Sequence, residues 1–357
     1  MKKILPLLLA GILLAACAPA ATPTADGGVG QGQQEAANGT APDGDTAAIE
    51  PIELIIYSPG SALAVPTQTI YEFARLVEEA SNGEITFSIF HSGELGNDAE
   101  ALISTRMGSI DIINAGTTGF TAFYENAMIL DLPFLFENSD YAFELLNGPI
   151  GQQIFGDMEN YDLVFLAQGD NGMRQIATTN RPIYSAADVD GLRIRVPTSQ
   201  MYLDVWEALG ATPIGLPLPE LSIALATGTA EGQDNAPFHL VANATYDSIR
   251  YFSMINYMWM GTTMAMNADT WNSLSPTHQD ILREQARVAA RFSFDTIAVD
   301  DLTAIEHLQA AGVVFNFEPD VQSFRDRLGG VENYFQQYAD EPWFDQSIID
   351  AILAAQQ

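Results

Sequence analysis

The sequence predicts an α/β fold of two lobes, and three observations support this. From residue 51 onward, short apolar segments that alternate like strands are followed by amphipathic, helix-forming segments, which is typical of α/β proteins. This rhythm restarts near residue 171 with a second unit of similar build. The 307 residues from 51 to the end are enough for two domains or one large domain. Two-lobed α/β proteins bind ligands between the lobes, at the carboxyl ends of parallel strands.

The first unit alternates strands and helices in a way that favours a mostly parallel sheet. Asn97 and Glu100 have the spacing of a capping box, so a helix is expected to begin there. Asn82-Gly83 and Gly108 have the turn chemistry that ends helices. The expected elements are a strand over 52–57, a helix from about 66, a strand over 85–89, a helix after 97 and a strand over 110–115.

The second unit repeats this pattern. Ser185, with Asp188 in the first turn, is expected to cap a short helical turn that closes at Gly191. A strand over 191–197 follows, with its apolar residues on one face. The remaining expected elements are strands at 163–167 and 174–178 joined by a turn at 169–172, a helix up to 209, a strand over 212–216, a helix over 219–227, a turn at 231–233, a largely helical stretch over 270–312 and a strand over 313–317.

The first 17 residues predict a secretory signal peptide with a lipidation site. A basic start is followed by an apolar run over 4–14 that is too short to span a bilayer. The ending Leu14-Ala15-Ala16-Cys17 resembles a bacterial lipobox, in which the cysteine is lipidated and becomes the first residue of the mature protein. Cys17 is the only cysteine, so no internal disulfide can form. We therefore expect an extracytoplasmic protein anchored to a membrane through Cys17; an ordinary signal peptide with a chance cysteine is the alternative.

Residues 18–50 predict a flexible linker, because they contain almost no large apolar side chains. Removal of the signal peptide takes both lysines, so the mature chain has 12 arginines against 46 acidic residues and a formal charge of about −34. Such a surface repels nucleic acid, which is therefore not an expected partner. An anionic ligand would need local positive charge, so the position of each arginine matters.

Arg195 lies at the carboxyl end of the expected strand over 191–197, where open α/β sheets bind ligands. Its guanidinium presents a planar fork of donors that suits a carboxylate. Side chains alternate along a strand, so Arg193 points to the same side as Arg195. Either arginine could therefore contact a ligand, and a surface salt bridge is the alternative role for both. The four histidines lack metal-ligand spacing, and no motif of a metalloprotease, a phosphate-binding loop or a serine hydrolase occurs. We expect no metal, cofactor or catalytic residue.

The chain resembles the solute-binding proteins of TRAP transporters, the DctP-type family, over about 52–340. The segments that carry the resemblance are 93–98 (GELGND), 132–136 (LPFLF), 172–175 (GMRQ), 180–183 (NRPI), 187–197 (ADVDGLRIRVP), 209–213 (LGATP), 224–228 (ALATG) and 231–235 (EGQDN). The resemblance implies a periplasmic-binding-protein-like fold with a hinge and a ligand cleft between the lobes. It also implies capture of a small carboxylate, delivery to a small and a large membrane subunit, and no covalent chemistry.

The resemblance assigns the carboxylate contact to Arg195, whose counterpart pairs with the ligand. Arg174 matches a second arginine that assists in many members, and Asn235 matches an amide that hydrogen-bonds the ligand. Thr198 matches a polar position just after the arginine strand. Helix capping is the alternative role for Thr198.

Asp98 and Ser58 match positions of the first lobe that contact ligand in some members; capping and turn formation are their alternative roles. Tyr257 belongs to the aromatic and methionine cluster 257–260. This cluster falls near the crossing back into the first lobe. We expect it either to pack in the core or to line the cleft.

Two departures from the family pattern narrow the ligand. Gly116 stands where some sialic-acid binders carry a glutamate, so that ligand is not expected. Asp234-Asn235 replaces the Glu-Trp pair of keto-acid binders that hold a metal, so a metal-assisted site is not expected either. This pair is closer to the dicarboxylate and sugar-acid binders.

The expected organisation has a first lobe formed by 51–171 with about 261–300, and a second lobe formed by 172–260 with about 301–357. The alternatives to uptake by a TRAP transporter are a ligand-sensing receptor of the same fold, a binding protein for an ATP-driven importer and a lipid-anchored hydrolase. The identity of the carboxylate and the oligomeric state do not follow from the sequence.

Overall fold

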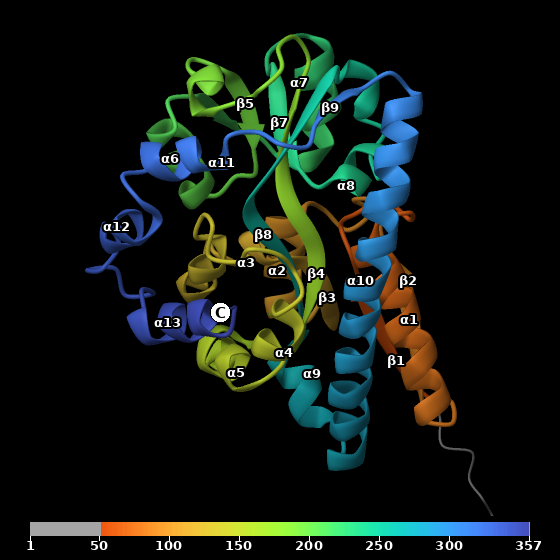
Figure 1. Cartoon of the computed structure of the whole chain (residues 1–357). Helices are drawn as coiled ribbons and strands as arrows, with labels where there is room; N and C mark the ends of the chain where they lie inside the picture. Colours follow the sequence, from red (N-terminus) through yellow and green to blue (C-terminus); the bar gives the residue numbers. More distant parts are fainter. Residues whose placement is uncertain (1–50, 357) are drawn as a thin grey trace, which may run out of the picture. The chain divides into compact units, whose positions relative to one another are not determined.

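A computed structural model of the chain describes residues 51–356, which form one mixed α/β body (Figure 1). The expected signal peptide, Cys17 and the expected linker lie outside these residues. Within the described part, nine strands form a single sheet in the order β2-β1-β3-β8-β4-β7-β5-β6, and β9 pairs with β8. No helix of this part is both long enough and apolar enough to cross a bilayer.

The strands are β1 (Ile52–Tyr57), β2 (Ile85–Phe90), β3 (Ile112–Gly116), β4 (Leu163–Thr178), β5 (Arg193–Val196), β6 (Thr212–Gly215), β7 (Gly232–Asn235), β8 (Tyr251–Asn267) and β9 (Val314–Asn316). The α-helices are α1 (Val65–Ala80), α2 (Asp98–Arg106), α3 (Thr117–Phe120), α4 (Ala142–Leu146), α5 (Pro149–Phe155), α6 (Gln200–Ala208), α7 (Leu221–Ala226), α8 (Pro237–Ala242), α9 (Ala268–Ser273), α10 (Pro276–Ala310), α11 (Val321–Arg327), α12 (Val331–Gln336) and α13 (Gln346–Ala354). The 3₁₀ helices are η1 (Glu125–Asp131), η2 (Met158–Tyr161), η3 (Ala186–Val189), η4 (Leu218–Glu220) and η5 (Tyr246–Ser248).

The local signals of the sequence are confirmed at several places. Helix α2 begins at a capping box in which the Asn97 side chain accepts from the backbone N–H of Glu100, and the Glu100 carboxylate accepts from that of Asn97. Ser185 begins η3 in the same manner. Helix α1 buries its expected apolar face, with Ile70 and Phe73 fully inaccessible. These helices cover a sheet whose β1, β2 and β3 are parallel, as are β5, β6 and β7.

Two expected turns are wrong. The stretch 169–172 does not end a strand, since β4 runs without a break from Leu163 to Thr178. Two residues of the expected turn at 231–233, Gly232 and Gln233, belong to β7, which pairs with β4 and β5. The sequence also did not indicate that β8 is 17 residues long. Strands β4 and β8 pair with each other in antiparallel orientation over most of their length. The hydrogen bonds of this long ladder stabilise the extended conformation of both strands.

The two long strands β4 and β8 run through both lobes at the centre of the molecule (Figure 1). One half of β8 pairs with β3 and its other half pairs with β9, while the end of β4 at 175–178 pairs with β7. The register of β4 against β8 shifts between Asp170 and Met173. Gly172 lies in this shift with φ +87°, and a Cβ there would lie 2.8 Å from that of Ala236. Glycine is the residue that adopts this conformation without strain, and a bulge lets a strand bend where it passes between lobes.

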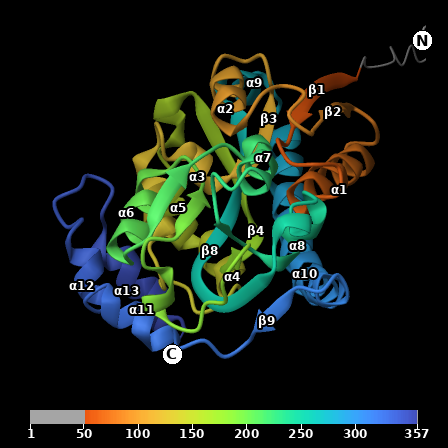
Figure 2. The ribbon, with the colours of Figure 1, turned by 90° about the horizontal axis from the view of Figure 1, so that it is seen from above.

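The C-terminal helices pack on elements of both parts of the chain. Helix α10 extends along both lobes and packs on α1, β4 and α8. Helix α11 packs on η3 of the second lobe, but α13 packs on α5 of the first. The side chain of Gln356 donates to the carbonyl oxygen of Leu135 and accepts from the backbone N–H of Glu137. The C-terminal segment thus returns to the first lobe, on the side of the molecule away from α1 and α10 (Figure 2).

Candidate ligand-binding cleft

A cavity of about 310 Å³ lies where segments of both lobes meet. The first lobe contributes the loop after β1, the start of α2 and the end of β3, while the second contributes the end of β5, the start of α6 and the end of β7. Six of the seven residues that the resemblance assigns to ligand binding line this cavity: Ser58, Asp98, Arg174, Arg195, Thr198 and Asn235. The seventh, Tyr257, does not.

Arg195 is buried in the cavity wall with its positive charge unpaired. Only 3% of the residue is accessible. Its Nε and Nη2 donate to the carbonyl oxygen of Leu216 at 2.9 and 2.6 Å. No ion pair to Arg195 forms within residues 51–356. Burial, and then the neighbouring charge of Arg174, lower the pKa of Arg195 to about 10. A buried guanidinium without a carboxylate is costly, so this site favours an anion.

Arg193 has a different environment from Arg195 and does not line the cavity. Its side chain is 47% exposed and lies 3.5 Å from the carboxylate of Glu231. Its guanidinium also donates to the carbonyl oxygens of Thr229 and Gly228. Arg193 therefore forms a surface ion pair outside the cavity.

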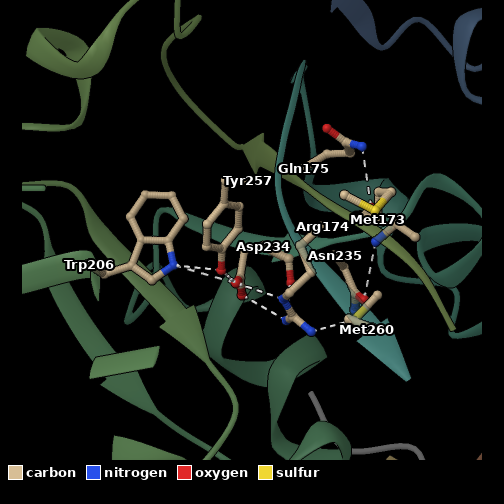
Figure 3. A network of polar contacts seen from close by, with 9 residues as sticks. Met173, Arg174, Gln175, Trp206, Asp234, Asn235, Tyr257 and Met260 are labelled. Atoms are coloured by element: carbon tan, nitrogen blue, oxygen red, sulfur yellow. Dashed lines mark hydrogen bonds and ion pairs between the residues drawn. The ribbon is translucent and has the colours of Figure 1, made fainter. Parts of the chain in front are cut away.

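Arg174 lines the cavity, but its charge is already paired. Its Nε donates to one carboxylate oxygen of Asp234 at 2.8 Å, and its Nη2 donates to the other at 2.9 Å (Figure 3). The ring of Tyr202 lies 4.7 Å from the guanidinium carbon. A bidentate pair with a stacked aromatic ring fixes the orientation of the arginine. Arg174 thus presents a neutralised guanidinium to the cavity beside the unpaired one of Arg195.

Tyr257 lies behind this ion pair and is fully buried. Its hydroxyl donates to Asp234 and accepts a hydrogen bond of 3.1 Å from the indole N–H of Trp206 (Figure 3). Of the two roles that the sequence left open, the structure favours packing in the core. Tyr257 donates to the carboxylate that pairs with Arg174, and it is not among the residues that line the cavity.

The remaining assigned residues supply neutral and acidic polar groups. Asn235 is buried at the end of β7, and Ser58 is buried after β1, where its hydroxyl accepts from that of Thr67. Thr198 lies on the exposed side of the cavity wall, just after β5. Asp98 is the first residue of α2, and burial raises its pKa.

Three further buried polar residues line the cavity and were not predicted as site residues from the sequence: Asp131, Tyr202 and His239. Burial lowers the pKa of His239 to about 3, so its ring is neutral and interacts with the Asn171 side chain over 2.9 Å. Burial also raises the pKa of Asp131 to about 8. The feature of the sequence that could have pointed to Asp131 is its position directly before the family motif at 132–136.

The cavity has the chemistry of a binding site for a small organic anion. It offers one unpaired guanidinium, a second guanidinium in an ion pair, and several hydroxyl, amide and carboxyl groups. No group of three or more histidine, cysteine, aspartate or glutamate side chains within residues 51–356 is arranged to hold a metal ion.

Comparison with known proteins gives one consistent family. The family model of bacterial extracellular solute-binding proteins, family 7 (DctP), matches residues 61–337. The 2,3-diketo-L-gulonate-binding periplasmic protein YiaO of Escherichia coli (strain K12) is 30% identical over 260 residues, which cover 72% of this chain and 79% of that protein.

Solved structures agree in fold. A TRAP periplasmic solute-binding protein from Polaromonas sp. JS666, bound to D-erythronate, has a TM-score of 0.80 and 25% identity, covering 85% of this chain and 98% of that one. A TRAP periplasmic solute-binding protein from Pseudomonas putida F1, with bound D-glucuronate, has a TM-score of 0.78 and 28% identity, covering 86% and 98%.

Proposed function

We propose that this chain, which belongs to the DctP family of bacterial extracellular solute-binding proteins, captures a sugar acid by its carboxylate in the cavity between the lobes. The chain is a periplasmic solute-binding protein of the TRAP type and not an enzyme. Its task is therefore to bind a ligand and to release it unchanged.

The unpaired charge of Arg195 is the observation that supports the proposal most. Its guanidinium keeps donors that the single carbonyl of Leu216 does not satisfy. A ligand carboxylate would pair with this charge, and hydrogen bonds to a buried charged group contribute about 1.5–3 kcal/mol each. Arg174, held by Asp234, would orient the same carboxylate from one side. Asn235 and Thr198 would add neutral hydrogen bonds from the second lobe.

A sugar acid fits the rest of the cavity better than a simple fatty acid does. Ser58 and Asp98 of the first lobe also line the cavity and can hydrogen-bond hydroxyl groups. The two related proteins at 25% and 28% identity were solved with D-erythronate and D-glucuronate, which are both polyhydroxy acids. These ligands are small enough for a cavity of about 310 Å³.

Ligand binding would shift the lobes toward the closed arrangement. An empty closed cleft buries the charge of Arg195 without a partner, whereas a bound carboxylate removes that cost. Residues 51–171 with about 261–300 would form one lobe and 172–260 the core of the other, with β4 and β8 bending near Gly172. The closed form would then deliver the ligand to the small and large membrane subunits of a TRAP transporter.

We also propose that Cys17 is lipidated, so that the protein is held at a membrane. The support is the ending Leu14-Ala15-Ala16-Cys17 after a signal-like segment. Intact mass of the protein purified from membranes should show acyl chains on an N-terminal cysteine. Recovery of Cys17→Ser in the soluble fraction, with the wild type in the membrane fraction, is the expected contrast. Equal distribution of both proteins would contradict lipidation.

The ligand class is tested by isothermal titration calorimetry on the purified protein. D-glucuronate, D-erythronate and D-galactonate form the first panel, and succinate, pyruvate and hexanoate form the second. At least one acid of the first panel should bind more tightly than every acid of the second. The proposal is wrong if none of the sugar acids binds, or if a neutral sugar such as glucose binds as tightly as its acid.

A further inference from the structure

Asp131 is a buried acidic residue of the cavity wall, and the proposed pairing of a ligand carboxylate with Arg195 gives it no role. It ends η1, it lines the cavity, and only 2% of it is accessible. Its Oδ2 atom is buried without a hydrogen-bond partner within residues 51–356. Buried polar atoms in folded proteins nearly always have a partner, so an unpartnered carboxyl oxygen in a cavity wall points to a ligand.

Tyr202 presents a second unpartnered oxygen at the same place. It belongs to α6 of the second lobe, lines the cavity, and has a buried hydroxyl without a partner within the same described residues. Helix α6 packs against η1, which brings the tyrosine to Asp131. The ring of Tyr202 stacks on Arg174, so its position is fixed. One group from each lobe therefore meets at one side of the cavity.

The charges around this pair favour a neutral ligand group. Arg174 and the neighbouring hydroxyl of Tyr202 lower the pKa of Asp131, but burial outweighs both effects and raises it to about 8. The charge of Arg174 is already balanced by Asp234. Asp131 therefore keeps its proton at neutral pH, and burial keeps the phenol of Tyr202 protonated as well. Two neutral O–H groups can donate to and accept from a ligand hydroxyl, whereas a second ligand carboxylate would have no cation left to pair with there.

We propose that Asp131 and Tyr202 form a hydroxyl-binding subsite that makes the cleft select polyhydroxy monocarboxylates over dicarboxylates and deoxy acids. The subsite rests on the proposed function, because it requires that the ligand carboxylate lies at Arg195. A site that is built to hydrogen-bond a hydroxyl rejects an analogue without it, since its own polar groups then stay unsatisfied. Asp131 and Tyr202 would thus set specificity, while Arg195 sets affinity for the acid group.

The test compares variants on matched acids. Dissociation constants are measured by calorimetry for D-galactonate, hexanoate and adipate, which share a six-carbon chain and differ in hydroxyl groups and in the second carboxylate. Asp131→Leu and Tyr202→Phe should each weaken D-galactonate at least tenfold and leave hexanoate and adipate within about threefold. Asp131→Asn keeps a neutral group that can donate and accept, so it should retain most of the preference for D-galactonate. Glu125→Gln, on the exposed side of η1, is the control and should change nothing.

The outcomes separate the subsite from the proposed function and from misfolding. If the wild type binds no acid of the panel, the proposed function fails. If it binds acids and both variants weaken all three acids equally, Asp131 and Tyr202 only support Arg174, and the subsite is refuted. Equal affinity of wild type, Asp131→Leu and Tyr202→Phe for D-galactonate refutes it as well. Thermal unfolding of each variant shows whether it is folded, and Asp131→Asn supplies the contrast if Asp131→Leu is not.

Discussion

Replacement of Arg195 by methionine separates ligand affinity from stability. Methionine keeps a long apolar side chain in the wall and removes the charge and the donors. Truncation of one partner of a buried, hydrogen-bonded ion pair costs about 3–5 kcal/mol, which corresponds to roughly 10²- to 10⁴-fold in the dissociation constant. Within residues 51–356, the Arg195 side chain donates only to the carbonyl oxygen of Leu216, from Nε and Nη2, so little else is lost.

The same replacement is not expected to destabilise the protein without ligand. Only 3% of Arg195 is accessible, its guanidinium has no ion-pair partner within residues 51–356, and burial already lowers its pKa to about 10. Removal of such a charge is neutral or stabilising, since a buried ion without a counterion costs free energy in the folded state. The midpoint of thermal unfolding of the unliganded variant should therefore equal or exceed that of the wild type.

The assay measures binding by calorimetry and unfolding by differential scanning fluorimetry on the same samples. Arg193→Met is the matched control, because Arg193 lies two residues away on β5 and pairs with Glu231 at the surface. It should keep the affinity within about twofold, since exposed ion pairs contribute about 0–1 kcal/mol. If Arg195→Met binds sugar acids within threefold of the wild type, the carboxylate does not lie at Arg195 and the reasoning fails.

Three further changes test the network around the cleft. Asp234→Ala leaves the buried charge of Arg174 unpaired and should lower the free energy of unfolding by about 3–5 kcal/mol in urea denaturation; an unchanged midpoint would contradict a structural ion pair. Tyr257→Phe removes one hydrogen bond to Asp234 and should cost about 1 kcal/mol of stability with less than a fivefold effect on affinity, whereas a larger loss of affinity would make Tyr257 a ligand contact after all. The pKa of Asp131 is raised from 3.8 to about 8, with Arg174 and Tyr202 facing it, so the folded protein holds this proton between those pH values while the unfolded chain does not. Its contribution to stability is present below about pH 4 and lost as the pH rises to about 8, so stability of Asp131→Asn should fall less between pH 5 and pH 8 than that of the wild type; parallel curves would assign the proton elsewhere.

The sequence by itself determined the local elements of this protein and the position of Arg195 at the end of a strand. Capping boxes at Asn97 and Ser185 act within four residues, so their chemistry is readable without the fold. The position of Arg195 at a strand end is similarly local, because a short apolar strand before a proline is evident in the sequence. The resemblance to the DctP family then turned that position into an expected carboxylate contact, and it brought Asn235 and Ser58 to the same cavity.

Tertiary structure alone decided how the two lobes are joined and which charges are paired. The stretch 169–172 is a turn by local composition, but β8 pairs with β4 on both sides of it and makes it a bulge within one strand. The pairing of Arg174 with Asp234 and the meeting of Asp131 with Tyr202 join residues 60 or more positions apart. Such contacts depend on the packing of whole elements, and no spacing in the sequence encodes them. The same long-range packing places no counterion from residues 51–356 beside Arg195, and this distinguishes it from Arg193 on the same strand.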